Sequence, residues 1–191
     1  MVRYLLLVAV AVVISMVFFG AMRTLLGDGI VNVITLVILV VVGVIVWRNL
    51  QLNRKVTDAT PEQRTAALAF APDPGKAALY VYRTQFVGKA VGINVDVDGR
   101  QAAQLKSPRF TRIALTPGVH KLELYLGVPD KKKPGANTQE LNVAAGDVVI
   151  QKIEIEPQMV GAVIKATRTD AQKARSEIGS AKMVAPDVGE I

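Results

Sequence analysis

The chain has 191 residues, a hydrophobic fraction of 51%, a formal net charge of +7 and no cysteine. This length allows one modest globular domain with additions, and the lack of cysteine excludes a disulfide framework. Aromatic residues make up only 5%, without a visible stacking platform, so we expect no nucleic-acid partner. The basic excess instead favours an acidic partner or anionic lipid headgroups.

Two long apolar segments dominate the first fifty residues. Residues 4–22 and 30–47 contain no charged side chain. Each is about as long as a helix that crosses a hydrocarbon core of roughly 30 Å. The sequence therefore predicts a transmembrane helical hairpin over residues 1–47. Basic residues follow the second segment, so the positive-inside bias predicts a bacterial inner-membrane protein with both termini in the cytoplasm. A periplasmic C-terminal domain is the alternative.

Residues 48–75 have the pattern of a stalk with one short helix. Thr60 is a candidate N-cap, Pro61 takes the first helical position, and Gln63 completes a capping-box pattern. These signals predict a helix over about 61–70. Two prolines and a glycine in residues 71–75 end it.

A two-residue hydrophobic period begins near residue 77. Short runs rich in valine, isoleucine, leucine and tyrosine alternate with Gly- and Pro-containing turns. These runs are residues 78–84, 91–98, 100–105, 109–116, 119–127, 139–144, 147–156 and 159–167. The predicted fold class is thus an α+β membrane protein, with two transmembrane helices before a mainly antiparallel β-sandwich of seven to eight strands over 76–168. Residues 169–191 hold few large apolar side chains, so we expect a frayed helix over 170–178 followed by a flexible tail.

Residues 94–99, NVDVDG, match the opening of an EF-hand calcium loop. An EF-hand needs a bidentate acid at its twelfth position, which here is Leu105, and a helix on each side. The segment is better explained as a hairpin that turns at Asp98-Gly99, where positive φ is accepted. We therefore expect no metal site.

Known catalytic patterns are missing from the sequence. His120 is the only histidine, and it follows a Pro-Gly turn without a partner set for zinc. We expect one of its ring nitrogens to bond the backbone near that turn. Phosphate-binding glycine loops and a Gly-x-Ser-x-Gly elbow are also missing from the sequence. The sequence therefore predicts no catalytic residue, no cofactor and no enzyme activity.

Two groups of residues are candidates for interaction. Lys131, Lys132 and Lys133 lie in a loop bounded by proline and glycine, where they could contact an anionic surface or only form a solvated tip. Tyr80, Tyr82 and Arg83 could form a surface cluster for a partner, but the two-residue period favours packing of the tyrosines in the core with their hydroxyls at its rim.

The ordered turn and strand motifs resemble a bacterial domain of unknown function found mostly in small envelope lipoproteins, a small β-sandwich similar to the PEGA type. The residues that carry the resemblance, within about 77–156, are Tyr80, Val81, Tyr82, Arg83, Gly88, Asp98, Gly99, Phe110, Pro117, Gly118, His120 and Gly146. The resemblance implies a β-sandwich and brings no catalytic residues. This chain departs from that family because it has two long apolar segments instead of a lipidated cysteine.

These observations predict a non-enzymatic accessory or scaffold protein, anchored in the lipid bilayer, whose β-sandwich binds another component of an inner-membrane complex. That component would be another subunit or a second copy of the chain. The alternative is an extracytoplasmic envelope-binding module that contacts glycan or an outer-layer protein.

Overall fold

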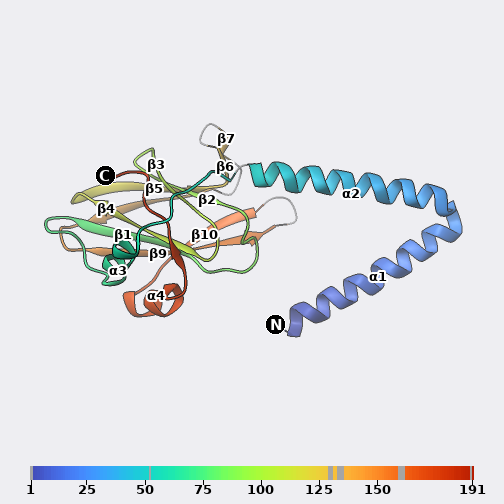
Figure 1. Ribbon diagram of the computed structural model, residues 1–191, viewed down its shortest axis with the longest axis horizontal. Helices are drawn as coiled ribbons and strands as arrows, with labels where there is room; N and C mark the ends of the chain where they lie inside the picture. Colours follow the sequence, from blue (N-terminus) through green and yellow to red (C-terminus); the bar gives the residue numbers. More distant parts are fainter. Residues whose placement is uncertain (1, 52, 129–130, 133–135, 159–161, 190) are drawn as a thin grey trace. The chain divides into compact units, whose positions relative to one another are not determined.

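The computed structural model describes residues 2–51, 53–128, 131–132, 136–158, 162–189 and 191 (Figure 1). The chain divides into two compact units, Met1–Arg48 and Asn49–Ile191. The first unit consists of helices. The second contains the sheets and two further helices.

Two helices form the N-terminal unit. Helix α1 spans Val2–Leu26 and helix α2 spans Asp28–Gln51, so α2 continues for three residues into the second unit. Gly27, at φ +81°, separates them. In the described part of the chain, no helix meets both the length and the apolarity that a membrane crossing requires. This finding overturns the predicted transmembrane hairpin and the inner-membrane location inferred from it.

The second unit is built on two main sheets. The five-stranded sheet has the order β10-β9-β1-β4-β11, and the four-stranded sheet has the order β3-β2-β5-β8. The strands are β1 (Ala77–Arg83), β2 (Ile93–Val97), β3 (Arg100–Leu105), β4 (Arg109–Leu115), β5 (Gly118–Tyr125), β8 (Asn137–Val143), β9 (Val148–Pro157), β10 (Ala162–Arg168) and β11 (Lys182–Met183). A small ribbon pairs β6 (Gly127–Val128) with β7 (Lys131–Lys132). The pairings are antiparallel except β1 with β9 and β11 with β4, which are parallel.

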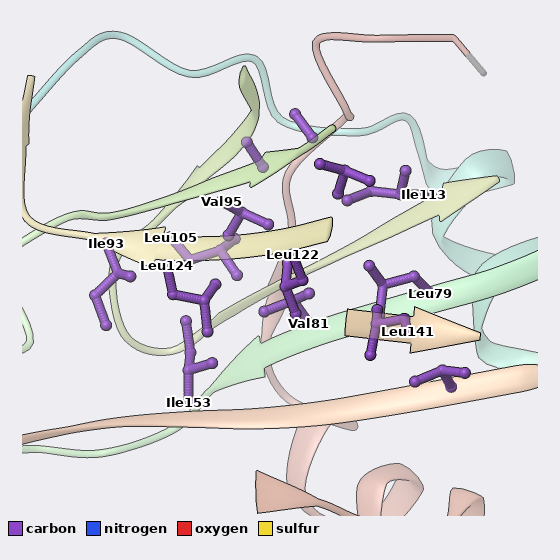
Figure 2. Close-up of a cluster of buried hydrophobic side chains, with 14 of the residues drawn as sticks. Leu79, Val81, Ile93, Val95, Leu105, Ile113, Leu122, Leu124, Leu141 and Ile153 are labelled. Atoms are coloured by element: carbon purple, nitrogen blue, oxygen red, sulfur yellow. The ribbon is translucent and has the colours of Figure 1, made fainter. Parts of the chain in front are cut away.

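Alternation along β1 divides the core into two layers. Leu79 and Val81 point between the two sheets, where they join residues such as Val95, Leu122 and Leu124 (Figure 2). Neighbouring residues of β1 point to the opposite face, because successive side chains in a strand alternate. On that face a second apolar cluster lies against helices α3 (Pro61–Leu68) and α4 (Ala171–Ile178).

Helix α3 begins as the sequence predicts. The Thr60 hydroxyl accepts a hydrogen bond from Gln63 N–H at 3.2 Å, and the Gln63 side chain accepts one from Thr60 N–H at 2.9 Å. This reciprocal pair is a capping box, which confirms the predicted helix start. Just after α3, the ring of Phe70 stacks on Tyr80 at 4.9 Å between centroids.

The C-terminal region contains the helix that the sequence predicts over residues 170–178. Asp170 caps α4 by accepting a hydrogen bond from Lys173 N–H at 2.8 Å. Ala174 and Ile178 are buried one helical turn apart against the second apolar layer. Helix spacing gives this segment a narrow apolar stripe although its composition is mostly polar. The helix predicted over residues 170–178 is therefore present as α4, and its packed apolar stripe keeps it ordered.

The Asp98-Gly99 turn has the geometry that its sequence predicts. Asp98 has φ 51° and Gly99 has φ 76°, as a primed two-residue hairpin turn requires. The turn joins β2 to β3, and strands flank it on both sides. This confirms the hairpin in place of the helix-flanked EF-hand geometry.

Candidate functional site

The three predicted residues on β1 are buried. Tyr80 donates its hydroxyl hydrogen to Ala67 O at 2.8 Å, and it lies with Tyr82 in the layer beneath the helices. Burial raises the pKa of the Tyr82 hydroxyl to about 12. Arg83 is buried too. None of the three offers an exposed surface to a partner, so their contacts are structural.

The lysine loop is described in part. Lys131 and Lys132 form β7, where Lys131 pairs with Val128 and Lys132 with Gly127. Lys133 lies outside the described residues. The candidate role of these lysines therefore stays a prediction.

Arg83 organises the loop that follows β1, residues 84–92. Its guanidinium donates hydrogen bonds to Val91 O at 2.6 Å, to Gly88 O at 2.9 Å and to Val87 O at 3.2 Å. Burial lowers the pKa of Arg83 to about 10, so the group remains charged at neutral pH. A buried cation that gathers three carbonyl groups fixes the shape of the loop around it.

A second side chain ties this loop to the neighbouring strand. Gln85 donates to Ile155 O and accepts from Ile155 N–H, both at 2.7 Å, so its amide imitates a strand neighbour of β9. Between these two anchors, Phe86 is 82% exposed and Val87 is 40% exposed. The ammonium of Lys89 lies 5.5 Å from the centre of the Phe86 ring. The loop therefore presents an apolar tip beside a cation. The sequence signal was an aromatic residue in a glycine-containing link.

His120 connects two turns at the opposite end of the sandwich. Its Nδ1 lies 2.7 Å from a carboxylate oxygen of Asp98, and its Nε2 lies 2.7 Å from Thr116 O. The contact with Thr116 confirms the predicted bond to backbone near the turn. Asp98 also accepts a hydrogen bond from Lys121 N–H at 2.7 Å. The Asp98 carboxylate therefore connects the β2–β3 turn to the first half of β5.

These contacts favour the doubly protonated imidazole, because both ring nitrogens face acceptors. Burial alone would lower the pKa of His120, but the hydrogen bonds to Thr116 O and Asp98 outweigh it and raise the pKa. Burial alone would raise the pKa of Asp98, but the bonds from Lys121 N–H and His120 lower it. The pair is thus a structural ion pair at mildly acidic pH.

One side of the sandwich is sealed by the chain's own segments. We call residues 53–60 the strap and residues 181–189 and 191 the C-terminal segment. Val184 N–H donates to Phe110 O at 2.8 Å, and Asp187 N–H donates to Ala102 O at 2.8 Å. The C-terminal segment thus occupies the outer edges of β4 and β3. We call this side the closed edge.

The strap lies over the C-terminal segment in turn. Ala59 N–H donates to Met183 O at 2.9 Å, and Ala185 N–H donates to Thr57 O at 3.0 Å. Two ion pairs add to these contacts: Arg54 with Asp187, and Arg109 with Asp58. The predicted stalk is therefore partly integrated into the sandwich.

The other side of the sandwich ends in β10 and β8, and we call it the open edge. Thr169 N–H donates to Ile150 O at 3.0 Å, and this bond identifies which residue pairs of β10 and β9 are hydrogen-bonded. Because hydrogen-bonded pairs alternate in an antiparallel ladder, every second residue of β10 directs its backbone groups away from β9. These residues are Ala162, Ile164, Ala166 and Arg168.

The same alternation applies to β8. Asp98 N–H donates to Lys121 O, so the backbone of Lys121 faces β2 and that of Leu122 faces β8. The outward groups of β8 then belong to Thr138, Glu140 and Asn142. Within the described ranges, no backbone hydrogen bond reaches the outward groups of either strand. Among the described residues, the open edge therefore offers two rows of donors and acceptors that have no backbone partner.

In the part of the chain that the structure describes, no group of three or more His, Asp or Glu residues is placed to hold a metal ion. No protein-family model matches the sequence, and no curated protein matches it significantly.

Proposed function

We propose that this protein is a non-enzymatic binding protein whose β-sandwich takes up an extended segment of a protein partner at the open edge. The partner segment adds as a strand beside β10 and completes the hydrogen bonds that β10 leaves outward. The observation that carries the proposal is the asymmetry between the two edges. The chain covers one edge with its own backbone, and the described residues leave the other uncovered.

Strand addition fits the chemistry of β10. An unpaired edge supplies affinity through main-chain hydrogen bonds, and alternate side chains supply specificity. Val163, Lys165 and Thr167 are not in the inter-sheet core, whereas Ile164 is buried in it. A bound segment would thus meet an apolar group, a cation and a hydroxyl along one face. This accessory role also agrees with the resemblance to a small sandwich that brings no catalytic residues.

A proline at position 166 tests the proposal. Ala166 directs its N–H outward, so Ala166→Pro removes a donor that a partner needs and spares the bonds to β9. Thr167→Pro is the matched control for fold damage, because Thr167 directs its N–H toward β9.

The binding readout is photocrosslinking. The full chain carries a photocrosslinking residue in place of Val163, which is 41% exposed, and crosslinked proteins are identified from cells of the source organism. We expect a defined crosslinked partner that disappears with Ala166→Pro while the melting temperature stays near that of the parent. A partner that persists in the Ala166→Pro protein, or the absence of any crosslink at this edge, contradicts the proposal.

A further inference from the structure

The links at the two ends of the sandwich carry charges of opposite sign. The strand pairings gather the described residues of four links at one end: 84–92, 106–108, 126–128 with 131–132 and 136, and 158. We call it the lysine end. Its links carry Lys89 and Lys106, and the backbone of Lys131 and Lys132 lies there in β7. The sequence of these links adds Lys133 and one acidic residue, Asp130, outside the described residues.

The opposite end is acidic. Its links are residues 69–76, 98–99, 116–117, 144–147 and 169–170. They carry Asp73, Asp98, Asp147, Asp170 and Lys76. Each of the four aspartates accepts a hydrogen bond within the second unit, from Arg112, from His120, from Ala144 N–H and from Lys173 N–H in turn. Side chains of Arg112 and His120 thus partner Asp73 and Asp98, whereas backbone N–H groups satisfy Asp147 and Asp170. Glu156, on β9, lies near the lysine end, and its carboxylate is paired with Lys165.

The exposed aromatic tip lies at the lysine end. Phe86 and Val87 project from the loop that Arg83 and Gln85 hold in one shape. Gly88, at φ +67°, lets the chain turn there, and an added Cβ would lie 3.2 Å from the Arg83 guanidinium. Ser107 N–H donates to Lys89 O at 3.1 Å, which joins this loop to the link that carries Lys106. Apolar and cationic groups therefore share one constrained surface.

We propose that the lysine end is a contact surface for anionic phospholipid headgroups, with Phe86 entering the interfacial layer. The side chains of Phe86 and Val87 form a small convex apolar tip with cations beside it. A lipid headgroup layer is deformable and can accommodate this shape. Lysines near an anionic lipid surface contribute by charge, and aromatic rings favour the headgroup layer. This surface is separate from the open edge, so it stands whether or not β10 takes up a partner.

The experiment uses labels placed at the two ends. The chain has no cysteine, so a single introduced cysteine carries one environment-sensitive fluorophore. Val87→Cys places the label at the lysine end, and Ala145→Cys places it at the acidic end. Full-length protein is mixed with vesicles of phosphatidylglycerol and phosphatidylcholine, or of phosphatidylcholine alone. We expect a blue-shifted, brighter emission from the Val87 label with the anionic vesicles only, and no change from the Ala145 label.

Charge and apolar variants separate the two contributions. Relative to the Val87-labelled parent, Lys89→Gln and Lys106→Gln each lower the partition coefficient about fivefold at low salt. Their deficit shrinks as salt is raised, because mobile ions screen exposed charges. Phe86→Ser lowers partitioning at every salt concentration, because apolar contact is not screened. Lys76→Gln at the acidic end is the matched control and leaves the partition coefficient unchanged.

The N-terminal helices are common to all these variants, so differences among variants report on the sandwich. An equal response of both labels means that the sandwich has no preferred lipid-facing end and overturns the proposal. An equal response to neutral and anionic vesicles, or no response at Val87, also overturns it. The absence of any crosslink at the open edge of the parent protein, together with normal lipid binding, contradicts only the proposed function.

Discussion

The two edges of this sandwich solve the same physical problem in different ways. A strand at the edge of a sheet exposes unpaired N–H and C=O groups that can pair with another chain. At the closed edge, the strap and the C-terminal segment satisfy those groups from within the molecule. At the open edge, the described residues leave β10 with only side chains as protection, among them Lys165. The difference shows that an edge can be sealed by backbone or guarded by charge.

The sealing of the closed edge rests on burial and backbone bonds more than on ion pairs. Val184 is fully buried in the inter-sheet core, and its carbonyl accepts the Thr111 hydroxyl at 3.0 Å. The Arg109–Asp58 pair is partly exposed, and such pairs contribute at most about 1 kcal/mol. A substitution that removes a backbone hydrogen bond should therefore reveal a larger difference in stability between the two edges than a substitution that removes a charge.

The largest expected effect comes from proline at the closed edge. Val184→Pro removes the hydrogen bond to Phe110 O and the side chain that fills the core, so we expect the free energy of unfolding to fall by about 3 kcal/mol. Ala166→Pro at the open edge should cost less than about 1 kcal/mol, because its N–H points outward. Urea denaturation of both proteins measures the difference. Equal losses would mean that the two edges are equivalent in backbone protection.

The next effect concerns the junction of the strap with helix α3. Thr60→Ala removes the oxygen that accepts Gln63 N–H, which should cost about 1 kcal/mol. Thr65→Ala, in the exposed face of the same helix, is the matched control and should change stability by less than about 0.5 kcal/mol. Thermal unfolding followed by circular dichroism compares them. A Thr60 variant as stable as the Thr65 variant would show that the cap does not support the closed edge.

Local patterns predicted what depends on local chemistry. The capping box at Thr60 and the turn at Asp98-Gly99 each need only a few neighbouring residues, and both are confirmed. The eight alternating runs correspond to strands, because a half-buried strand imposes a period of two. The backbone contact of His120 followed from its place beside the Pro-Gly turn.

What the sequence did not reveal depends on partners far along the chain. The parallel pairing of β1 with β9 joins residues about seventy positions apart, and no local pattern encodes it. The C-terminal segment gains its order from Val184 and Asp187, which bond β4 and β3. The predicted membrane hairpin relied on segment length and apolarity alone, and the described helices do not support it.

A smaller effect on stability should come from the pH dependence of the His120–Asp98 pair, which lies between the two edges. His120 sits in β5, which pairs with the open-edge strand β8, and Asp98 belongs to the hairpin that leads into β3. The pKa of His120 is raised in the folded protein, so its stabilisation is present below about pH 6.5 and is lost as pH rises through the folded pKa. The pKa of Asp98 is lowered, so its share is present above about pH 4 and is lost on further acidification.

Stability should therefore decline between mildly acidic and alkaline pH, by a modest amount because the Asp98 side chain is 37% exposed. His120→Gln should flatten this decline. Hydrogen exchange at alkaline pH should show faster exchange around residues 116–121 and unchanged protection at Val184. A decline of the same size in the His120→Gln protein would assign the pH dependence to another group.

The smallest change in stability, with the clearest consequence for the open edge, is expected from Lys165. If two copies paired through β10 about a two-fold axis at this residue, the lysines of both copies would face each other directly, and like charges at that position oppose pairing. Lys165→Val removes the repulsion and should change the free energy of unfolding by less than about 0.5 kcal/mol, because the residue is exposed and its pair with Glu156 is too. Sedimentation velocity should show concentration-dependent self-association of the valine variant, whereas Thr167→Val, which keeps the lysine, should sediment like the parent. High salt should move the parent toward the valine variant, because screening weakens the same repulsion. A Lys165→Val protein that sediments like the parent at every concentration would show that the edge is protected by something other than this charge.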